Sequence, residues 1–125
     1  MTTRGSRLGA WAPVVLWAAV IFAFSSIPSL STELGTWDTI LRKLAHVTEY
    51  AILGGLLQRA LRVPSLAVAL AVLYAVTDEV HQTFVEGRAG APLDVGIDAV
   101  GALAGVLLWR RLLERDAVGW RGRHT

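Results

Sequence analysis

Four apolar stretches, separated by short polar segments, make up most of the chain. The first, 8-LGAWAPVVLWAAVIFAF-24, has no charged residue over 17 positions. A helix needs about 20 mostly apolar residues to cross the hydrocarbon core of a bilayer. The pattern predicts an all-α, polytopic membrane protein, a bundle of four transmembrane helices. We expect these helices at about residues 8–28, 40–61, 64–84 and 93–113, followed by a cytoplasmic tail over 114–125, within a single domain of residues 1–125.

The second and third stretches carry ionisable residues at one end. In 40-ILRKLAHVTEYAILGGLLQRAL-61, only nine residues in the second half lie between charges, so a membrane helix here must hold His46 and Glu49 near one end. The third stretch, 63-VPSLAVALAVLYAVT-77, runs directly into 77-TDEVHQTF-84, where four hydrophilic residues fall within five positions. The sequence therefore raises the question of whether these residues only end a helix or build a site.

Composition agrees with a membrane protein. Hydrophobic residues make up 54% of the chain and charged residues 18%, whereas soluble domains have roughly 45–50% and about 25%. The lack of cysteine excludes disulfides, thiolate ligands and cysteine nucleophiles. Arg4 and Arg7 precede the first stretch, as in a secretory signal peptide. That stretch is longer than the usual span of about 7–15 residues and lacks a small-residue cleavage site, so we favour a membrane helix.

The distribution of Lys and Arg predicts which ends face the cytoplasm, because positive residues concentrate in cytoplasmic loops. With four spans and a cytoplasmic N-terminus, nine of the 12 positive residues lie inside, and eight of the 10 acidic residues lie outside. We therefore expect a multi-pass protein with both termini in the cytoplasm. The inside residues are Arg4, Arg7, Arg59, Arg62, Arg110, Arg111, Arg115, Arg121 and Arg123, and the outside ones are Arg42, Lys43 and Arg88.

Nucleic-acid binding is the rival explanation of the net charge of +2 and of the basic segment 110–123. A basic cluster alone is only an electrostatic footprint. Apart from Trp120, this segment has no interleaved aromatic residues, and membrane topology already accounts for its arginines. We expect no nucleic-acid partner.

Hydrophilic residues of all four segments meet at the outer face in this topology. An Asp at the centre of a membrane helix costs about 2.5–3.5 kcal/mol, and less near the ends. Hydrogen bonds between membrane helices contribute about 0.6 kcal/mol on average, so a few such residues would serve as interhelical glue. Six or more ionisable groups exceed that need and favour a functional site. The residues are Ser25, Ser26, Lys43, His46, Glu49, Asp78, Glu79, His81, Gln82, Asp94 and Asp98.

Helical spacing predicts which residues of the third helix share a face. Tyr74, Asp78 and His81 lie at i, i+4 and i+7, so we expect them on one side. Glu79 points roughly 100° away from Asp78. We expect it to serve a neighbouring helix or the following loop.

The last helix carries a stripe of small and acidic residues. Asp94, Asp98, Gly101 and Gly105 follow one another at intervals of four, three and four positions. The two glycines form a G-x-x-x-G motif, which lets two helices approach closely. We therefore expect this stripe to face the interior of the bundle.

The order of these residues resembles that of the VanZ-like membrane proteins. The block DExHQxF at 78–84, followed by 87-GR-88 and an aspartate six residues later, is fairly specific, and the matching elements span residues 24–105. Two positions depart from the pattern, since Glu86 stands where the family usually has proline and Asp98 where it often has asparagine. The matching elements are 24-FSSIP-28, Lys43, His46, Glu49, Tyr50, 78-DEVHQTF-84, 87-GR-88, Asp94, Gly101 and Gly105.

The resemblance implies a small polytopic protein of the bacterial cytoplasmic membrane. The family is named for a glycopeptide-resistance accessory component linked to teicoplanin, so a link to the glycopeptide response is an expectation for this chain. No biochemical activity follows, because the family is described mainly by sequence. The partner that the polar residues themselves suggest is a membrane lipid or a lipid-linked envelope precursor.

The polar residues have two main interpretations. They form either the active site of an enzyme or the binding site of a protein that catalyses no reaction. In an enzyme, a histidine that titrates near neutral pH would be the general acid or base. In both, a lysine and an arginine would hold a phosphate or headgroup. The candidate catalytic residues are His46, His81, Asp78, Glu49 and Asp94, the candidate headgroup ligands are Lys43 and Arg88, and the supporting residues are Glu79, Gln82, Asp98 and Tyr50.

A metal-dependent hydrolase is a third interpretation. The histidines and carboxylates of this set would suffice for Zn²⁺ or a harder cation. The chain lacks the HExxH spacing of known zinc helices, so the sequence assigns no metal ligands. It also leaves the cofactor and the oligomeric state open, and interhelical glue stays the alternative to any site.

Overall fold

The computed structural model describes residues 4–26, 36–84 and 92–123. In this part of the chain every regular element is a helix. The predicted all-α architecture is thereby confirmed for the described residues. The helices are α1 (Arg4–Ser25), α2 (Thr36–Leu61), α3 (Pro64–Thr83) and α4 (Pro92–Arg123).

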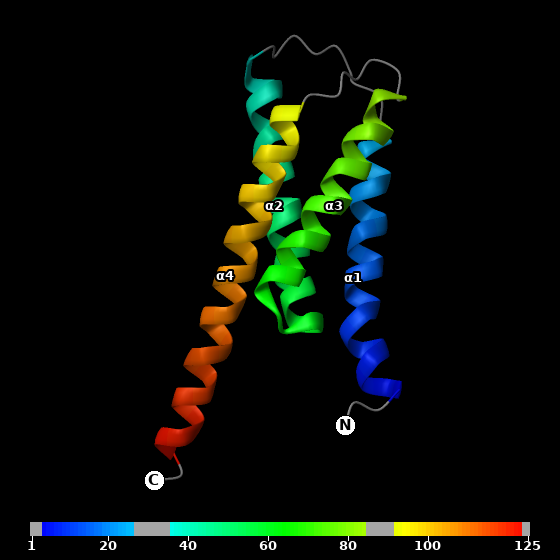
Figure 1. Ribbon diagram of the computed structural model, residues 1–125. Coiled ribbons are helices and arrows are strands. Elements are labelled where there is room, and N and C mark those ends of the chain that lie inside the picture. Colours follow the sequence, from blue (N-terminus) through cyan, green and yellow to red (C-terminus); the bar gives the residue numbers. More distant parts are fainter. Residues whose placement is uncertain (1–3, 27–35, 85–91, 124–125) are drawn as a thin grey trace.

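The four helices lie side by side, and each runs opposite to the one before it in the chain (Figure 1). The chain termini and the turn between α2 and α3 lie at one end of the bundle, which we call the terminal end. The opposite end is called the distal end. The terminal end is formed by Arg4, Leu61, Pro64 and Arg123, and the distal end by Ser25, Thr36, Thr83 and Pro92.

Two helices are longer than the hydrophobic pattern predicts. Helix α2 begins at Thr36, four residues earlier than expected, and α4 continues to Arg123, ten residues further than expected. Helix α1 begins at Arg4 and ends at Ser25, so it is displaced toward the N-terminus. The reason is that apolar residues mark the part of a helix in apolar surroundings, whereas the backbone stays helical until a cap or turn stops it.

A two-residue connection joins α2 to α3. Arg62 has a φ of 61°, in the left-handed region, and its N–H donates to the carbonyl of Gln58 at 2.8 Å. A residue in this conformation is a common way to end a helix. Val63 is extended, and Pro64 begins α3 at the position where proline fits best. The short turn fixes α3 antiparallel to α2.

One face of α3 packs through alanines and then becomes polar. Ala67, Ala71 and Ala75 are completely buried, at intervals of one helical turn. The next turn of the same face brings Asp78, which is 4% exposed, and the one after it Gln82, which is 5% exposed. The packing stripe that anchors α3 therefore delivers hydrophilic side chains into the interior at the distal end.

Helices α2 and α4 are in backbone contact. A Cβ added to Gly101 would lie 2.6 Å from the carbonyl oxygen of Val47, and one added to Gly105 would clash with the carbonyl of Ala51. Both glycines are buried, as is Asp98 on the same stripe. The predicted close approach at the G-x-x-x-G motif is confirmed. This close contact between the two backbones places the start of α4 against the start of α2.

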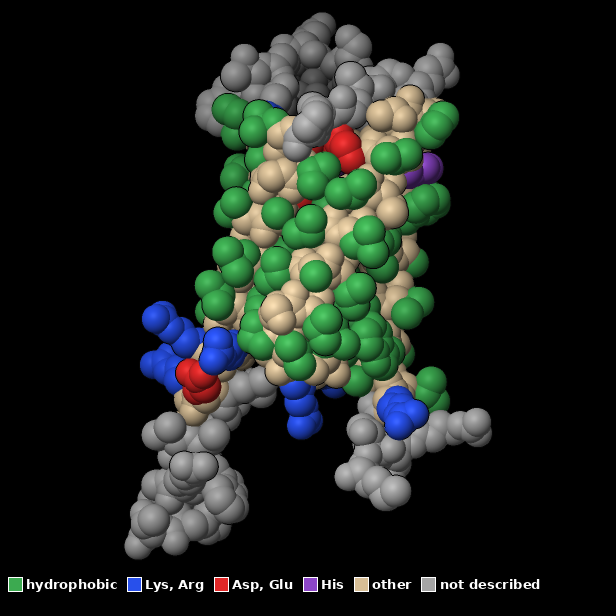
Figure 2. Space-filling view, viewed as in Figure 1, with side chains coloured by type: hydrophobic (Ala, Val, Ile, Leu, Met, Phe, Trp, Pro, Cys, Tyr) green, Lys and Arg blue, Asp and Glu red, His purple; other side chains and the backbone are tan. Residues whose placement is uncertain are grey.

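The outward surface is apolar along most of the bundle. Leu16 of α1, Leu73 of α3 and Leu108 of α4 are 69%, 60% and 61% exposed. Figure 2 shows apolar side chains covering the middle of the molecule, with Lys and Arg gathered at the terminal end. A soluble protein rarely exposes so continuous an apolar surface. The described surface is therefore that of a protein placed in lipid.

One helix in the described part of the chain qualifies as a membrane span by length and hydropathy, over Arg7–Ser25. The other helices hold ionisable residues within their length, such as His46 in α2 and Asp78 in α3. These residues lower the hydropathy of the segments in which they lie. Hydropathy of the separate helices thus supports one span, and four spans stay a prediction.

Candidate functional site

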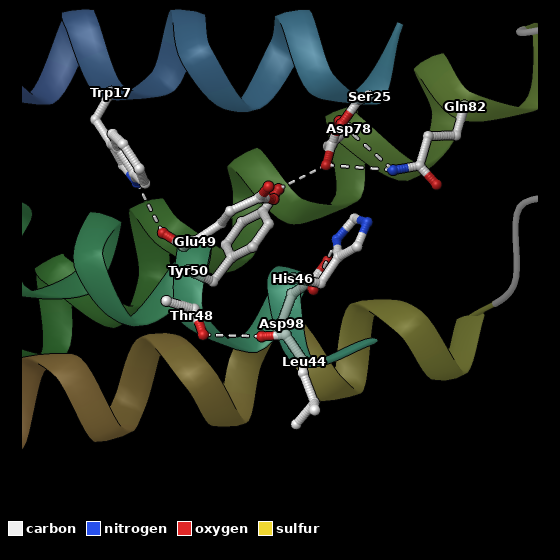
Figure 3. Close-up of polar contacts among 10 residues, drawn as sticks. All are labelled: Trp17, Ser25, Leu44, His46, Thr48, Glu49, Tyr50, Asp78, Gln82 and Asp98. Carbon is white, nitrogen blue, oxygen red and sulfur yellow. Dashed lines mark hydrogen bonds and ion pairs between the residues drawn. The ribbon is translucent and has the colours of Figure 1, made fainter. Parts of the chain in front are cut away.

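Polar side chains from all four helices meet inside the distal end of the bundle (Figure 3). Five of them are at most 5% exposed, although they sit among apolar helices. Buried polar groups are costly unless they find partners, so their contacts decide what the site can do. We call this set the polar cluster; it consists of Ser25 of α1, His46 and Tyr50 of α2, Asp78 and Gln82 of α3, and Asp98 of α4.

A chain of hydrogen bonds crosses three helices at Asp78. The hydroxyl of Tyr50, a completely buried residue, donates to Asp78 Oδ2 at 3.0 Å. The amide of Gln82 lies 3.5 Å from the same oxygen and 3.4 Å from Ser25 Oγ. Both contacts of the amide are long, so the tyrosine bond is the principal one. These bonds tie α2 to α3 and lead on to the end of α1.

His46 and Asp98 face each other across the contact between α2 and α4. His46 Nδ1 lies 3.3 Å from Asp98 Oδ1. The side chain of His46 is 21% exposed, and that of Asp98 only 1%. Within the described residues neither of these two atoms makes a well-formed hydrogen bond. The pair is thus held at ion-pair distance in a place that water hardly reaches.

The two contacts come together as one group of potential metal ligands. His46, Asp78 and Asp98 each offer one atom, and the three atoms lie within 4.8 Å of one another. Asp78 uses Oδ2 for its bond with Tyr50, while its Oδ1 is buried without a hydrogen bond in the described part of the chain. A histidine nitrogen and two carboxylate oxygens therefore converge from three helices.

The other predicted site residues lie around this cluster rather than in it. Glu79 is buried, at 8% exposure, and Glu49 and Asp94 are half-buried. Lys43 is exposed near the start of α2. Arg88 lies outside the described residues, so its predicted role as a headgroup ligand stays a prediction.

His81 is turned toward α1 and away from the polar cluster. Its Nε2 lies 3.0 Å from Ser26 Oγ, and its ring stacks on Phe22 with centroids 4.3 Å apart. Tyr74, two turns earlier, also faces α1, where its hydroxyl donates to the carbonyl of Ala18. The expected common face of α3 is therefore divided, with Asp78 pointing inward and the other two residues contacting α1.

Three features at or beside the cluster go beyond what the sequence predicts. Ser25 was expected at the outer face without a role in the site, yet it is 2% exposed and contacts Gln82. Asp98 was expected only to support the site, yet it is the most deeply buried carboxylate among the described residues. The indole of Trp17 donates to the carbonyl of Glu49 at 2.9 Å and so fixes α1 against α2. The segment 24-FSSIP-28 was the only available signal for Ser25, and an apolar stretch gives none for Trp17.

A second polar feature lies at the terminal end, between α2 and α4. An open hollow of about 720 Å³ is lined by three arginines and one acid, together with an amide, an indole and a proline: Arg59, Arg62, Arg110, Glu114, Gln58, Trp109 and Pro64. Glu114 pairs with Arg110 at 3.5 Å. Arginines in such a hollow suit phosphate groups at the membrane surface. It is separate from the polar cluster, and it has to be controlled for in any test of lipid binding.

The apolar surface, the segregated arginines and the buried polar residues define the class, a small helical membrane protein. A family model described as VanZ/LLP1 matches residues 10–114. The chain therefore belongs to the VanZ-like family, as its residue pattern predicts. No curated protein and no solved structure matches it.

Proposed function

We propose that the chain crosses the bacterial cytoplasmic membrane four times, with both termini in the cytoplasm and the polar cluster near the outer face. Three observations support this arrangement. Each helix exposes large apolar side chains, such as Leu16, Ile52, Leu73 and Leu108. The arginines gather at the terminal end, as the positive-inside rule requires. The family is one of membrane proteins.

We further propose that the distal end binds the headgroup of an anionic lipid or of a lipid-linked envelope precursor. The observation that carries this proposal is the convergence of buried polar side chains from four helices at the end opposite the arginines. An interhelical hydrogen bond contributes only about 0.6 kcal/mol on average, whereas an Asp at the centre of a membrane helix costs about 2.5–3.5 kcal/mol. Holding the helices together therefore does not account for these groups. Intramembrane ionisable residues generally mark functional sites.

Most of the predicted residues have a role in this proposal. Lys43 is exposed near the start of α2, where its ammonium can meet a phosphate at the membrane surface. Arg88 would act with it through its bidentate guanidinium. The buried residues of the polar cluster would contact the polar part of the headgroup, and half-buried Glu49 and Asp94 would shape the entrance.

Acid–base catalysis on the bound headgroup is a second candidate function. The contact of 3.3 Å between His46 Nδ1 and Asp98 Oδ1 favours it. A carboxylate that orients a histidine is a common arrangement for a general base. With His46 as the base, the reaction class would be hydrolysis or transfer at a phosphate-linked group. Turnover of a phosphate-containing lipid by the purified protein, lost in His46→Ala, would distinguish the enzyme from the binder.

Native mass spectrometry of the purified, detergent-solubilised protein tests the binding proposal. We expect the wild type to retain an anionic lipid, and Lys43→Ala to retain clearly less of it. Arg59→Ala is the matched control, because it removes one cation from the hollow at the terminal end and leaves the distal end intact. If Lys43→Ala retains as much lipid as the wild type while Arg59→Ala loses it, the lipid sits at the terminal end and the proposal is wrong.

A further inference from the structure

We propose that His46, Asp78 and Asp98 bind one divalent transition-metal ion, of the class represented by Zn²⁺. The proposal goes beyond headgroup binding and does not depend on it, because it concerns residues inside the bundle. It also gives a role to Asp98, the most deeply buried carboxylate among the described residues.

The ligand atoms are already close to the positions that a metal would require. Zn²⁺ binds histidine nitrogen and carboxylate oxygen at about 2.0–2.2 Å, so neighbouring ligand atoms of a tetrahedral site lie roughly 3.4 Å apart. His46 Nδ1 and Asp98 Oδ1 are 3.3 Å apart. The atom offered by Asp78 completes a set within 4.8 Å. Metal binding would require these atoms to move closer together, toward the spacing of about 3.4 Å.

Unsatisfied, buried atoms point to a missing partner. Asp98 is 1% exposed and Asp78 4% exposed, and Oδ1 of each is without a hydrogen bond among the described residues. His46 Nδ1 and Asp98 Oδ1 lie 3.3 Å apart but make no well-formed hydrogen bond, so within the described part of the chain the only contact of each is with the other. Asp78 Oδ1 lacks a hydrogen-bond partner among the described residues, and buried polar atoms in this state are costly. One metal ion would satisfy all three atoms at once.

The surroundings of Asp78 resemble the outer shell of a metal site. Ligating carboxylates are usually held by a further hydrogen bond that orients them. Tyr50 donates to Asp78 Oδ2 at 3.0 Å, and Oδ1 makes no hydrogen bond among the described residues, so this second oxygen is available to a metal. The amide of Gln82 also contacts Asp78 Oδ2, at 3.5 Å, so neither Tyr50 nor Gln82 occupies Oδ1.

Charge balance supports a divalent ion. Asp78 and Asp98 bring two negative charges into the interior, and a neutral His46 adds none. A divalent cation cancels both charges, which the low dielectric of the interior favours.

Three protein ligands would leave one coordination position open. In zinc sites this is the arrangement that admits water or a ligand oxygen. If the headgroup proposal also holds, a phosphate oxygen could take that position. This last step rests on the proposed function, whereas the metal site itself does not.

Isothermal titration of the purified full-length chain with Zn²⁺, after treatment with a chelator, tests the proposal. We expect one ion per chain. His46→Ala and Asp98→Asn should weaken binding by more than about tenfold, and Tyr50→Phe by about tenfold, as for other outer-shell changes. His81→Ala is the matched control, because this histidine contacts α1 instead and should leave affinity unchanged.

If a variant fails to fold, metal binding by the wild type still tests the proposal. Co²⁺ in place of Zn²⁺ should give the intense visible absorption of a four-coordinate site with one histidine ligand. A wild type that binds neither ion overturns the proposal, and so does equal binding by folded His46→Ala and wild type. Loss of binding in His81→Ala alone would also contradict it. Lipid retention measured on the same samples separates this outcome from failure of the headgroup proposal.

Discussion

Gly105 of α4 lies against the backbone carbonyl of Ala51 of α2, so closely that no side chain fits between them. The same helices bring Asp98 of α4 to His46 of α2, two turns nearer the distal end. Close backbone packing and the position of the polar cluster are thus properties of one interface. A change at the glycine is expected to affect the site through the distance between the helices.

Gly105→Leu should lower the free energy of unfolding by about 1–3 kcal/mol or more, because overpacking forces two backbones apart. Gly96→Leu is the matched control. Gly96 lies on the same helix with open space where a side chain would go, so its replacement should change stability by less than about 0.5 kcal/mol. Thermal unfolding in detergent measures both. Equal melting temperatures for Gly105→Leu and wild type would show that the close contact is absent in the protein.

Tyr50→Phe removes the buried hydrogen bond to Asp78 and leaves the ring in place. Hydrogen bonds between membrane helices average about 0.6 kcal/mol and reach about 1.7. The acceptor is a buried carboxylate, so we expect a loss near the upper value. Thr77→Val is the control, because Thr77 is exposed and bonds only within its own helix. A loss no larger than that of the control would mean that the cluster contributes nothing to holding α2 and α3 together.

The topology can be tested by introducing single cysteines into this cysteine-free chain. In intact cells, an impermeant thiol reagent should label Leu34→Cys and Gly90→Cys. Arg62→Cys and Arg121→Cys should react only after the membrane is made permeable. The reverse pattern would place the polar cluster on the cytoplasmic side and would rule out the proposed contact with an envelope precursor at the outer face.

The sequence predicts the helices and the inward stripe of α4 well. Apolar stretches locate helices, and Gly101 and Gly105 at a spacing of four residues indicate a contact surface. The pattern does not say which helix makes the contact. That α2 packs there, with Val47 and Ala51 opposite the glycines, depends on the turn at Arg62 and on the packing of all four helices.

The candidate site is predicted only in outline. The spacing along α3 predicts that Asp78 and His81 share one face of the helix. In the structure His81 instead contacts Ser26 and Phe22 of α1, whereas Asp78 points into the bundle. Contacts between helices, such as His46 with Asp98, depend on helix rotation, which no single stretch encodes. The potential metal ligands His46, Asp78 and Asp98 come from three different helices, so their convergence also depends on helix rotation and leaves no motif in the sequence.

The central claim is that the polar cluster is a working site and not only a means of holding the helices together. The most direct test measures thermal stability and function in the same variants, His46→Ala and Asp78→Asn. Function is read as rescue of a deletion strain from sensitivity to teicoplanin and other envelope antibiotics. We expect both variants to stay folded in the membrane and to fail in rescue. Full rescue by folded variants would contradict the claim and leave the cluster as interhelical glue.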